Sequence, residues 1–448
     1  MKTNGTRLSA IDAFFVAYQE TSGVLMQLGV EVELKGRITR SDLEEVLEHI
    51  VRRWPPLGQR VRRRLFGLAW EGECRVSEML MVAKRREELA EWRNRPLNPF
   101  VEPPLQLLWI ANGATNLFAF RAHHAAVDGE GFFAVCVEGV RALAKRLGNE
   151  PLLGVRRPGA ALVHDHEIES KAAPGRRTPR SRLSLREAFQ TVQQMRREAQ
   201  SNQSAQLATR SCTPGDTTIV EKKLDHNDFR ELQRQATELG IAPGWLCAAA
   251  WMRAIHAWNI SRASNPTPLI SLEVPVSLRR RRDMHVRTGN WISPLTLYGD
   301  ATQPLEVLGI ELKQQLSKAV RQRSHLALPL ISWPAKFLPW PLFRRLAASP
   351  ELTGFATSHF AWFEQAQTLH DDTMRFSGGA LQMVDQQIYP PVCLHMGAAL
   401  SVLAWPERAQ IFLTYRMTAL SPAEAQTLLD LMVQELVSKH LSRRQVAV

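Results

Sequence analysis

The sequence predicts an α/β protein built from two lobes. With 448 residues, the chain is longer than one ordinary hydrophobic core requires. Patterns typical of strands and of helices follow one another in both halves. Between the halves, residues 154–183 are rich in Gly, Pro and Arg and have little periodicity, which is typical of a linker. We therefore expect a first lobe over 1–175, a linker with a basic helix over 176–216, and a second lobe over 217–448.

The first half contains closely spaced strand and helix signals. Stretches with strand character are 25–34, 105–111 and 117–122. A helix is expected from Ser41, because Ser41 and Glu44 have the spacing of a capping box, and Pro55 ends this helix. The dipeptide Asn112-Gly113 is typical of a hairpin turn, so it should join the second and third strands.

The second half has its own set of elements. Strands are expected at 217–224 and 268–276, and helices at 229–239, at 244–258 and from 422. Gly240 suits the end of the first of these helices, and Ser421 with Glu424 forms a capping box for the last one. The apolar helix contains Arg253 and His256, which favours a buried helix over a membrane span.

The composition limits which cellular compartment and which classes of partner are expected. The five cysteines are scattered and form no CxxC pair, which favours a reducing compartment and argues against a disulfide framework or a zinc site. No signal peptide or membrane span is visible, so we expect a cytoplasmic protein. The formal net charge of +12 suits a phosphorylated cofactor, an acidic protein or an anionic membrane, or else it forms a solvated basic surface that aids solubility. No nucleic-acid motif accompanies this charge, so we do not expect a nucleic-acid partner.

The most informative stretch is His123-His124-Ala125-Ala126-Val127-Asp128-Gly129, directly after an apolar strand. A histidine at a strand end can take a proton from a hydroxyl or amine as that group attacks a carbonyl. No serine or cysteine has a nucleophile signature, which favours direct transfer over an acyl-enzyme. The glycine permits a tight turn and leaves a backbone N–H open to a developing oxyanion. Adjacent strand residues point to opposite faces, so the two histidines are not expected to hold one metal ion.

This stretch matches the HHxxxDG signature, and the sequence resembles the condensation-domain and CoA-dependent acyltransferase superfamily. The resemblance continues through residues 8–15, 56–61, 96–105, 274–279 and 289–293. It implies two lobes like chloramphenicol acetyltransferase that form a pseudo-dimer with a central tunnel. The free-standing members that the chain resembles are wax ester synthase/diacylglycerol acyltransferases and polyketide-associated acyltransferases.

The resemblance also implies a role for each residue of the motif. His124 would be the general base at the middle of the tunnel. His123 and Gly129 would shape the loop that presents it. Asp128 would be structural and would pair with an arginine, for which Arg279 is the candidate.

Two further residues are expected to contact substrate. By the resemblance, Asn290 would line the tunnel from the second lobe. Ser358 lies in the nearest counterpart, Ala356–Phe360, of a Ser-Asn-Val-Pro-Gly element of wax ester synthases that the chain lacks. The arginine run 279–282 is a candidate for binding the phosphates of CoA or phosphopantetheine, or else forms a solvated loop.

We therefore expect an acyltransferase that moves an acyl group from a thioester to a hydroxyl or amine, with O-acyl transfer favoured. The thioester, acyl-CoA or phosphopantetheine-bound, would be a co-substrate, and no bound cofactor is expected. One alternative is a free-standing condensation enzyme of natural-product assembly that uses an acyl carrier protein. Another is an inactive relative that serves as a binding protein. The segment 333–345 mixes aromatic and cationic side chains, so it would contact a membrane, line an acyl channel or pack as a bent segment on the core.

Overall fold

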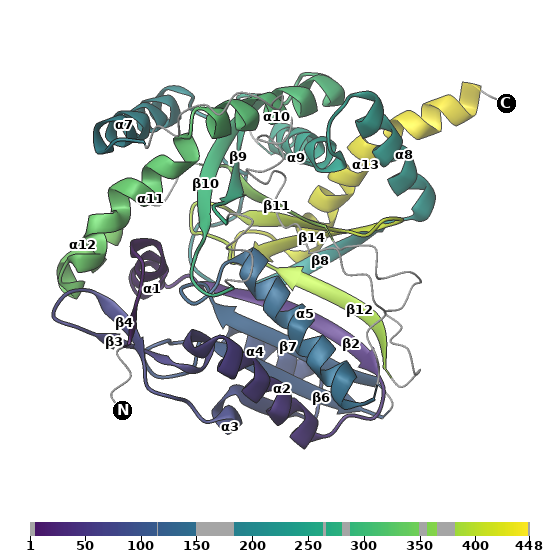
Figure 1. Ribbon diagram of the computed structural model, residues 1–448. Helices are drawn as coiled ribbons and strands as arrows, with labels where there is room; N and C mark the ends of the chain where they lie inside the picture. The colour runs from purple at the N-terminus through teal and green to yellow at the C-terminus, as the bar shows by residue number, and fades with distance from the viewer. Residues whose placement is uncertain are drawn as a thin grey trace, which may run out of the picture.

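The computed structural model describes residues 5–113, 115–148, 183–262, 266–279, 287–348, 356–364 and 381–446. These residues form two lobes, one above the other in Figure 1, and each lobe has a central β-sheet with helices packed against it. The α/β class predicted from the sequence is therefore confirmed. Apart from residue 183, the expected linker over 154–183 lies outside the described residues.

The first lobe is built on a mixed five-stranded sheet. In spatial order its strands are β12 (Gln382–Tyr389), β2 (Gln27–Lys35), β7 (Thr115–His123), β6 (Leu105–Asn112) and β5 (Leu80–Ala83). All neighbours are antiparallel except β5 and β6. The turn expected between β6 and β7 is present, and Gly113 there has a φ of 61°, a conformation that glycine adopts without a steric penalty.

Helices and a small second sheet complete this lobe. Its helices are α1 (Ala10–Ser22), α2 (Arg40–Arg53), η1 (Pro55–Gly58), α3 (Val76–Met79), α4 (Glu87–Asn94) and α5 (Gly129–Arg146). The three-stranded sheet consists of β1 (Thr6–Arg7), β4 (Leu68–Glu71) and β3 (Arg60–Arg63). Helices α2 and α5 lie side by side (Figure 1), and the apolar face of α2 enters the core through Val46, Leu47 and Ile50. This packing positions the start of α5, where the histidine motif ends.

The second lobe is built on a six-stranded sheet. In spatial order its strands are β10 (Ile292–Asp300), β9 (Leu269–Ser277), β11 (Ser358–Glu364), β13 (Ala398–Ala404), β14 (Ala409–Arg416) and β8 (Thr217–Leu224). Its helices are α7 (Leu185–Ser201), α8 (His226–Glu238), α9 (Pro243–Ile260), α10 (Leu305–Arg321), η3 (Ser324–Leu326), α11 (Ala327–Ser332), η4 (Trp333–Phe337), α12 (Trp340–Ala347) and α13 (Pro422–Val446). As predicted, α9 is buried, and its residues Trp245, Trp251 and Trp258 are at most 2% exposed. None of the described helices is both long enough and apolar enough to cross a membrane.

One strand of the second half belongs to the sheet of the first lobe. Strand β12 pairs antiparallel with β2, with Tyr389 opposite Gly29. Gly29 is required there, because a Cβ atom would lie only 1.7 Å from the Tyr389 ring. The pairing removes an exposed edge from β2. A boundary at residue 217 therefore does not separate the two lobes completely.

The helix caps agree with the sequence at one end of the chain and differ at the other. Helix α2 is capped by Thr39, whose hydroxyl accepts a bond from Asp42 N at 3.3 Å while Asp42 Oδ2 accepts one from Thr39 N at 2.9 Å. The predicted cap at Ser41 is therefore wrong. The side chains of Thr39 and Asp42 form the capping box, and the helix begins before Ser41. The predicted box at α13 is confirmed, since Glu424 N donates to Ser421 Oγ at 3.3 Å and Ser421 N donates to Glu424 Oε2 at 2.7 Å.

The two lobes share part of one hydrophobic core. Leu403 and Phe412, on the inner face of the second sheet, belong to the same buried cluster as the apolar side chains of the first lobe. Trp340 and Phe343 of α12 join this cluster as well. The motif at the end of β7 therefore lies where two packed lobes meet.

Candidate active site

The motif forms a tight turn between β7 and α5. Strand β7 ends at His123, whose backbone N–H donates to Pro104 O at 2.8 Å, and α5 begins at Gly129. Within the turn, His123 Nδ1 accepts a hydrogen bond from Ala125 N at 3.1 Å. His123 is fully buried, and this burial, together with the nearby charge of His124, lowers its pKa to about 3. Its imidazole is therefore neutral at pH 7 and holds the turn in shape.

His124 is the imidazole that remains available for chemistry. Its ring stacks on the Phe15 ring of α1, with centroids 3.9 Å apart and planes at 20°, and 7% of the residue is exposed. Burial lowers its pKa, while hydrogen bonds and the charge of Asp128 act in the opposite direction. A neutral imidazole at pH 7 is the form that can accept a proton.

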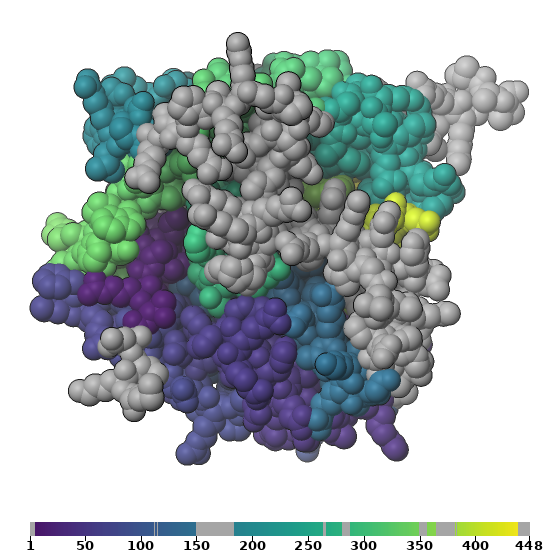
Figure 2. Space-filling model, in the orientation of Figure 1, coloured from purple at the N-terminus to yellow at the C-terminus, as the bar shows by residue number. Residues whose placement is uncertain are grey.

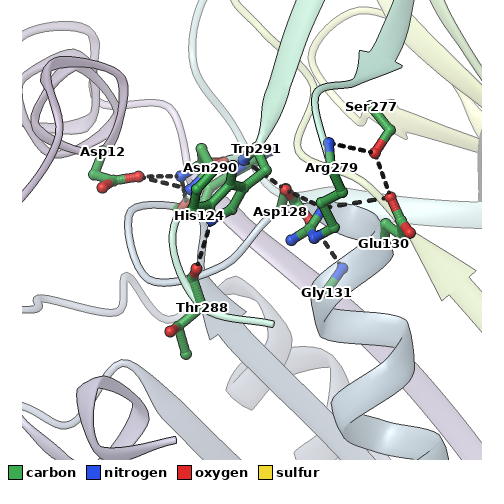
Figure 3. Close-up of polar contacts among 10 residues, drawn as sticks. All are labelled: Asp12, His124, Asp128, Glu130, Gly131, Ser277, Arg279, Thr288, Asn290 and Trp291. Carbon is green, nitrogen blue, oxygen red and sulfur yellow. Dashed lines mark hydrogen bonds and ion pairs between the residues drawn. The ribbon is translucent and has the colours of Figure 1, made fainter. Parts of the chain in front are cut away.

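Asp128 fixes the turn through three hydrogen bonds (Figure 3). Its Oδ1 atom accepts from Gly131 N at 2.8 Å, which caps α5. Its Oδ2 atom accepts from Arg279 Nη1 at 2.8 Å and from Trp291 N at 2.8 Å. Both residues of the Asp128–Arg279 ion pair have fully buried side chains. The pair expected from the sequence is therefore present, and it ties the motif to the second lobe.

Arg279 is shared between two carboxylates. Its Nη1 atom also lies 3.3 Å from Glu130 Oε2, which in turn accepts a bond from Ser277 Oγ at 2.8 Å. Burial disfavours the guanidinium charge, but Asp128 and Glu130 outweigh it and raise the pKa of Arg279. Because Arg279 is buried in this pair, it does not suit the phosphate binding considered for the arginine run. Residues 280–282 of that run lie outside the described residues.

Asn290 joins the motif to α1 and to the second lobe (Figure 3). Its Nδ2 atom donates to His124 O at 2.7 Å and to Asp12 Oδ1 at 2.8 Å, and its backbone N–H donates to the same carboxylate at 2.9 Å. Gly289, with a φ of 77°, pairs with Val127 and donates to Ala126 O at 2.7 Å. These contacts give Asn290 a positioning role beside the site, and the substrate contact expected from the sequence stays a prediction.

Asp12 is a site residue that lies outside the sequence motif. It is 6% exposed and, besides the Asn290 bonds, it closes a capping box with Ser9 at the start of α1. Burial raises the pKa of its carboxyl, although the bonds from Asn290 and Ser9 oppose this rise. The Ser-x-x-Asp spacing in the sequence predicts the cap, but it gives no sign that the same carboxylate reaches the second lobe.

The two glycines of this segment have different roles. Gly129 begins α5, and a Cβ atom there would lie at an ordinary 3.5 Å from the Phe363 ring. At Gly131 a Cβ atom would lie 2.1 Å from the backbone oxygen of Arg287 and 3.0 Å from Arg279 Nη2. The close approach between the lobes therefore requires glycine at position 131. Position 129, the glycine of the motif, has room for a Cβ atom.

Ser358 does not face the motif. Its hydroxyl accepts a bond from Trp251 Nε1 of α9 at 3.1 Å and donates to Ala398 O at 2.8 Å, and the residue is fully buried. Since successive strand residues point to opposite faces, Ser358 lies on the core side of β11 and His359 lies on the side of the first lobe. The structure therefore does not support the prediction that Ser358 contacts substrate.

Taken together, these residues place the neutral imidazole of His124 at the seam between the lobes and fix its loop from both sides. Such an arrangement suits proton transfer to and from a group that attacks a carbonyl. Within the described part of the chain, no group of three or more His, Cys, Asp or Glu side chains could hold a metal ion.

Comparison with solved structures identifies the fold of the protein. No protein-family model matches the sequence, and no curated protein does. The chain is similar to the trichothecene 15-O-acetyltransferase TRI3 from Fusarium sporotrichioides, at a TM-score of 0.68 and 13% identity, over 96% of this chain and 94% of that one. It is similar to a mutant starter condensation domain of the rhizomide synthetase RzmA, solved with C8-CoA and Leu-SNAC, at a TM-score of 0.64 and 14% identity, over 97% and 94%.

A third similar structure is the first condensation domain of the calcium-dependent antibiotic synthetase, at a TM-score of 0.63 and 13% identity, over 97% of this chain and 96% of that one. Each of these likenesses covers nearly the whole of both chains, so the two-lobed architecture is common to them. The protein therefore has the fold of these condensation domains and of this O-acetyltransferase.

Proposed function

We propose that the chain is an acyltransferase in which His124 is the general base. The observation that supports this proposal most directly is the neutral imidazole of His124 at the seam of the lobes. Asp128, Arg279 and Asn290 hold its loop in place. The fold similarity to an O-acetyltransferase and to condensation domains supports the same reaction class.

The proposed reaction transfers the acyl group in one addition and one elimination. The imidazole of His124 takes the proton of a hydroxyl or amine while that oxygen or nitrogen bonds to the thioester carbon. The tetrahedral oxyanion then collapses, the carbon–sulfur bond breaks, and the sulfur leaves with the proton from the imidazolium. The products are an ester or amide and a free thiol, and no acyl-enzyme forms. The thioester is a co-substrate, and this scheme requires no bound cofactor or metal.

The donor is an acyl thioester of CoA or of a phosphopantetheine carrier. Its free thiol gives the test: purified protein is incubated with acyl-CoAs or acyl carrier proteins and with alcohols and amines. Thiol release should match the acylated product found by mass spectrometry. Turnover with the carrier-bound donor alone would identify a free-standing condensation enzyme. Wild-type protein that releases no more thiol than His124→Ala with every donor would refute catalysis and favour a binding protein.

We also propose that this protein contacts a membrane surface through an apolar patch. The patch consists of six exposed apolar side chains, Leu65, Phe66, Trp333, Phe337, Leu342 and Leu346, which are between 39% and 81% exposed. Its two segments, 62–67 and 333–347, meet where Gly67 N donates to Leu338 O at 3.1 Å. Figure 2 shows them together at the left edge, with the light green segment above the indigo hairpin.

The charge of these two segments suits an anionic lipid surface. They contain six Arg or Lys residues and no carboxylate, although Glu20 and Glu71 pair with some of these cations from outside. Large apolar side chains surrounded by cations are typical of contacts with an anionic lipid interface. The double variant Phe66→Ser/Trp333→Ser should lose sedimentation with vesicles that contain phosphatidylglycerol, while Ile260→Ser, which alters an equally exposed side chain elsewhere, should keep it. Equal sedimentation of all three proteins would refute the contact.

A further inference from the structure

The face of the second sheet that turns toward the first lobe carries polar side chains that the transfer step does not use. Leu272, Val274 and Phe360 point into the core of the second lobe, so Glu273 and His359 point the opposite way. These two residues are paired in register between β9 and β11, and His359 Nδ1 lies 3.6 Å from Glu273 Oε1. Their side chains keep 19% and 26% exposure, for His359 and Glu273 respectively.

The row continues across the neighbouring strands. His359 is in register with Ala399 of β13, and Ala399 is in register with Thr414 of β14. Glu273, His359, Ala399 and Thr414 therefore span four adjacent strands, a length of about 14 Å at the usual strand spacing. The hydroxyls of Thr414 and of Ser401, two residues along β13, are buried and make no hydrogen bond within the described part of the chain. We call Glu273, His359, Ser401 and Thr414 the polar row.

Buried hydroxyls without partners are rare in folded proteins, because each loses its hydrogen bonds to water. Ser401 is fully buried and Thr414 is 1% exposed. Their strand neighbours Leu400 and Leu413 lie in the core of the second lobe, so both hydroxyls are on the same face as Glu273. Within the described part of the chain, both hydroxyls therefore lack hydrogen bonds on the face that Glu273 and His359 also line.

The Glu273 carboxylate interacts with imidazoles. Among the described residues its ion-pair partner is an imidazole, His359, and no Lys or Arg pairs with it. Burial raises the pKa of Glu273, but the imidazoles of His359, His395 and His124 together lower it below its usual value, so the group is ionised at pH 7. A partly buried anion of this kind is stabilised by a positive charge on a ligand. The protonated form of His124 is among the charges that lower the pKa of Glu273, so the row lies within electrostatic range of the proposed base.

We propose that the polar row binds the acyl acceptor and selects acceptors that carry an ammonium group in addition to the nucleophile. Glu273, whose side chain is partly exposed, pairs with the ammonium, and the buried hydroxyls of Ser401 and Thr414 extend the polar face beyond it. This inference rests on the proposed function, because the acceptor is defined by transfer at His124. It distinguishes this chain from an enzyme for simple fatty alcohols, for which a buried carboxylate would be unfavourable.

The test compares ω-amino alcohols, from ethanolamine to 8-amino-1-octanol, with the 1-alkanols and α,ω-diols of the same lengths and with octanoyl-CoA as donor. Wild-type protein should have a higher kcat/KM for the best amino alcohol than for the matching alkanol. Glu273→Gln should lower that value by roughly tenfold to a hundredfold, the effect of losing one charged hydrogen bond, and should lower the alkanol value much less. The control is Glu221→Gln, which removes a carboxylate of similar exposure, 28%, from the edge strand of the same sheet and should change neither value.

Three results would overturn the assignment: no preference in the wild type, an equal loss for alkanol and amino alcohol in Glu273→Gln, or diols that match amino alcohols in both proteins. Calorimetric binding of 6-amino-1-hexanol provides a readout that does not need turnover. Tighter binding by the wild type than by Glu273→Gln supports the row even if no acyl transfer occurs, an outcome that would refute only the proposed function. Equal binding by both proteins refutes the row.

Discussion

Replacing Asp128 with asparagine would remove one charge from the buried network while keeping the shape of the side chain. The carboxylate accepts bonds from Gly131 N, Trp291 N and Arg279 Nη1, each at 2.8 Å. The asparagine oxygen can replace only part of this set, and the amide NH₂ would face a donor. Breaking a buried ion pair from one side costs about 3–5 kcal/mol. Glu130 remains 3.3 Å from Arg279 and keeps part of the compensation, so we expect a loss of about 3 kcal/mol, at the low end of this range.

The free energy of unfolding is measured by urea denaturation with tryptophan fluorescence as the signal. Whole domains are stable by only about 5–15 kcal/mol, so a loss of this size is readily detected. The control is Glu44→Gln, which breaks the exposed Arg40–Glu44 pair at 2.8 Å on α2 and should cost about 0.5 kcal/mol or less. If Asp128→Asn cost no more than Glu44→Gln, the buried pair would not hold the motif in place.

Three further predictions concern the turn and its surroundings. Because the pKa of His123 is lowered to about 3, the unfolded chain binds a proton below pH 6.5 that the folded chain does not bind. The free energy of unfolding should therefore fall as the pH falls, by at most about 1.4 kcal/mol per pH unit from this group. His123→Asn should flatten this pH dependence, as measured by urea titrations. Gly131→Ala should lower the free energy of unfolding by about 1–3 kcal/mol, because its Cβ atom would clash with the backbone of Arg287. Gly129→Ala should be tolerated, so similar melting curves for the two variants would contradict this prediction. Ser358→Ala should lower stability by about 1–3 kcal/mol and leave KM for the acyl donor unchanged, and a raised KM with unchanged stability would restore Ser358 as a substrate contact.

Local sequence patterns predicted the elements around the site well. The strand expected at 217–224 is β8 with the same bounds, and the turn at Asn112-Gly113 joins β6 to β7. These signals depend on alternation and turn chemistry within a few residues, which a sequence displays directly. The ion pair between Asp128 and Arg279 was anticipated only through the resemblance, since 150 intervening residues separate the partners.

The remaining site residues depend on contacts between the lobes. The cap at Asp12 is local, but its bond to Asn290 spans 278 residues. Glu273 and His359 meet only because β9 and β11 are neighbours in the sheet. The orientation of Ser358 depends on which face of β11 packs against α9, and the exchange of β12 into the first sheet follows from pairing at an edge. Strand periodicity shows that a strand has two faces, but not which face meets the partner lobe.

The central claim is that His124 transfers the proton, and thiol release from an acyl thioester tests it most directly. In an active wild-type preparation, the rate should fall at low pH with a midpoint below 6.5, because the lowered pKa of His124 keeps the base unprotonated to more acidic pH than a free histidine. His124→Ala should reduce the rate by roughly 10²–10⁴-fold, the range for losing a general base, with an unchanged melting curve. A folded His124→Ala protein that releases thiol and forms product at a rate close to that of the wild type would contradict the account.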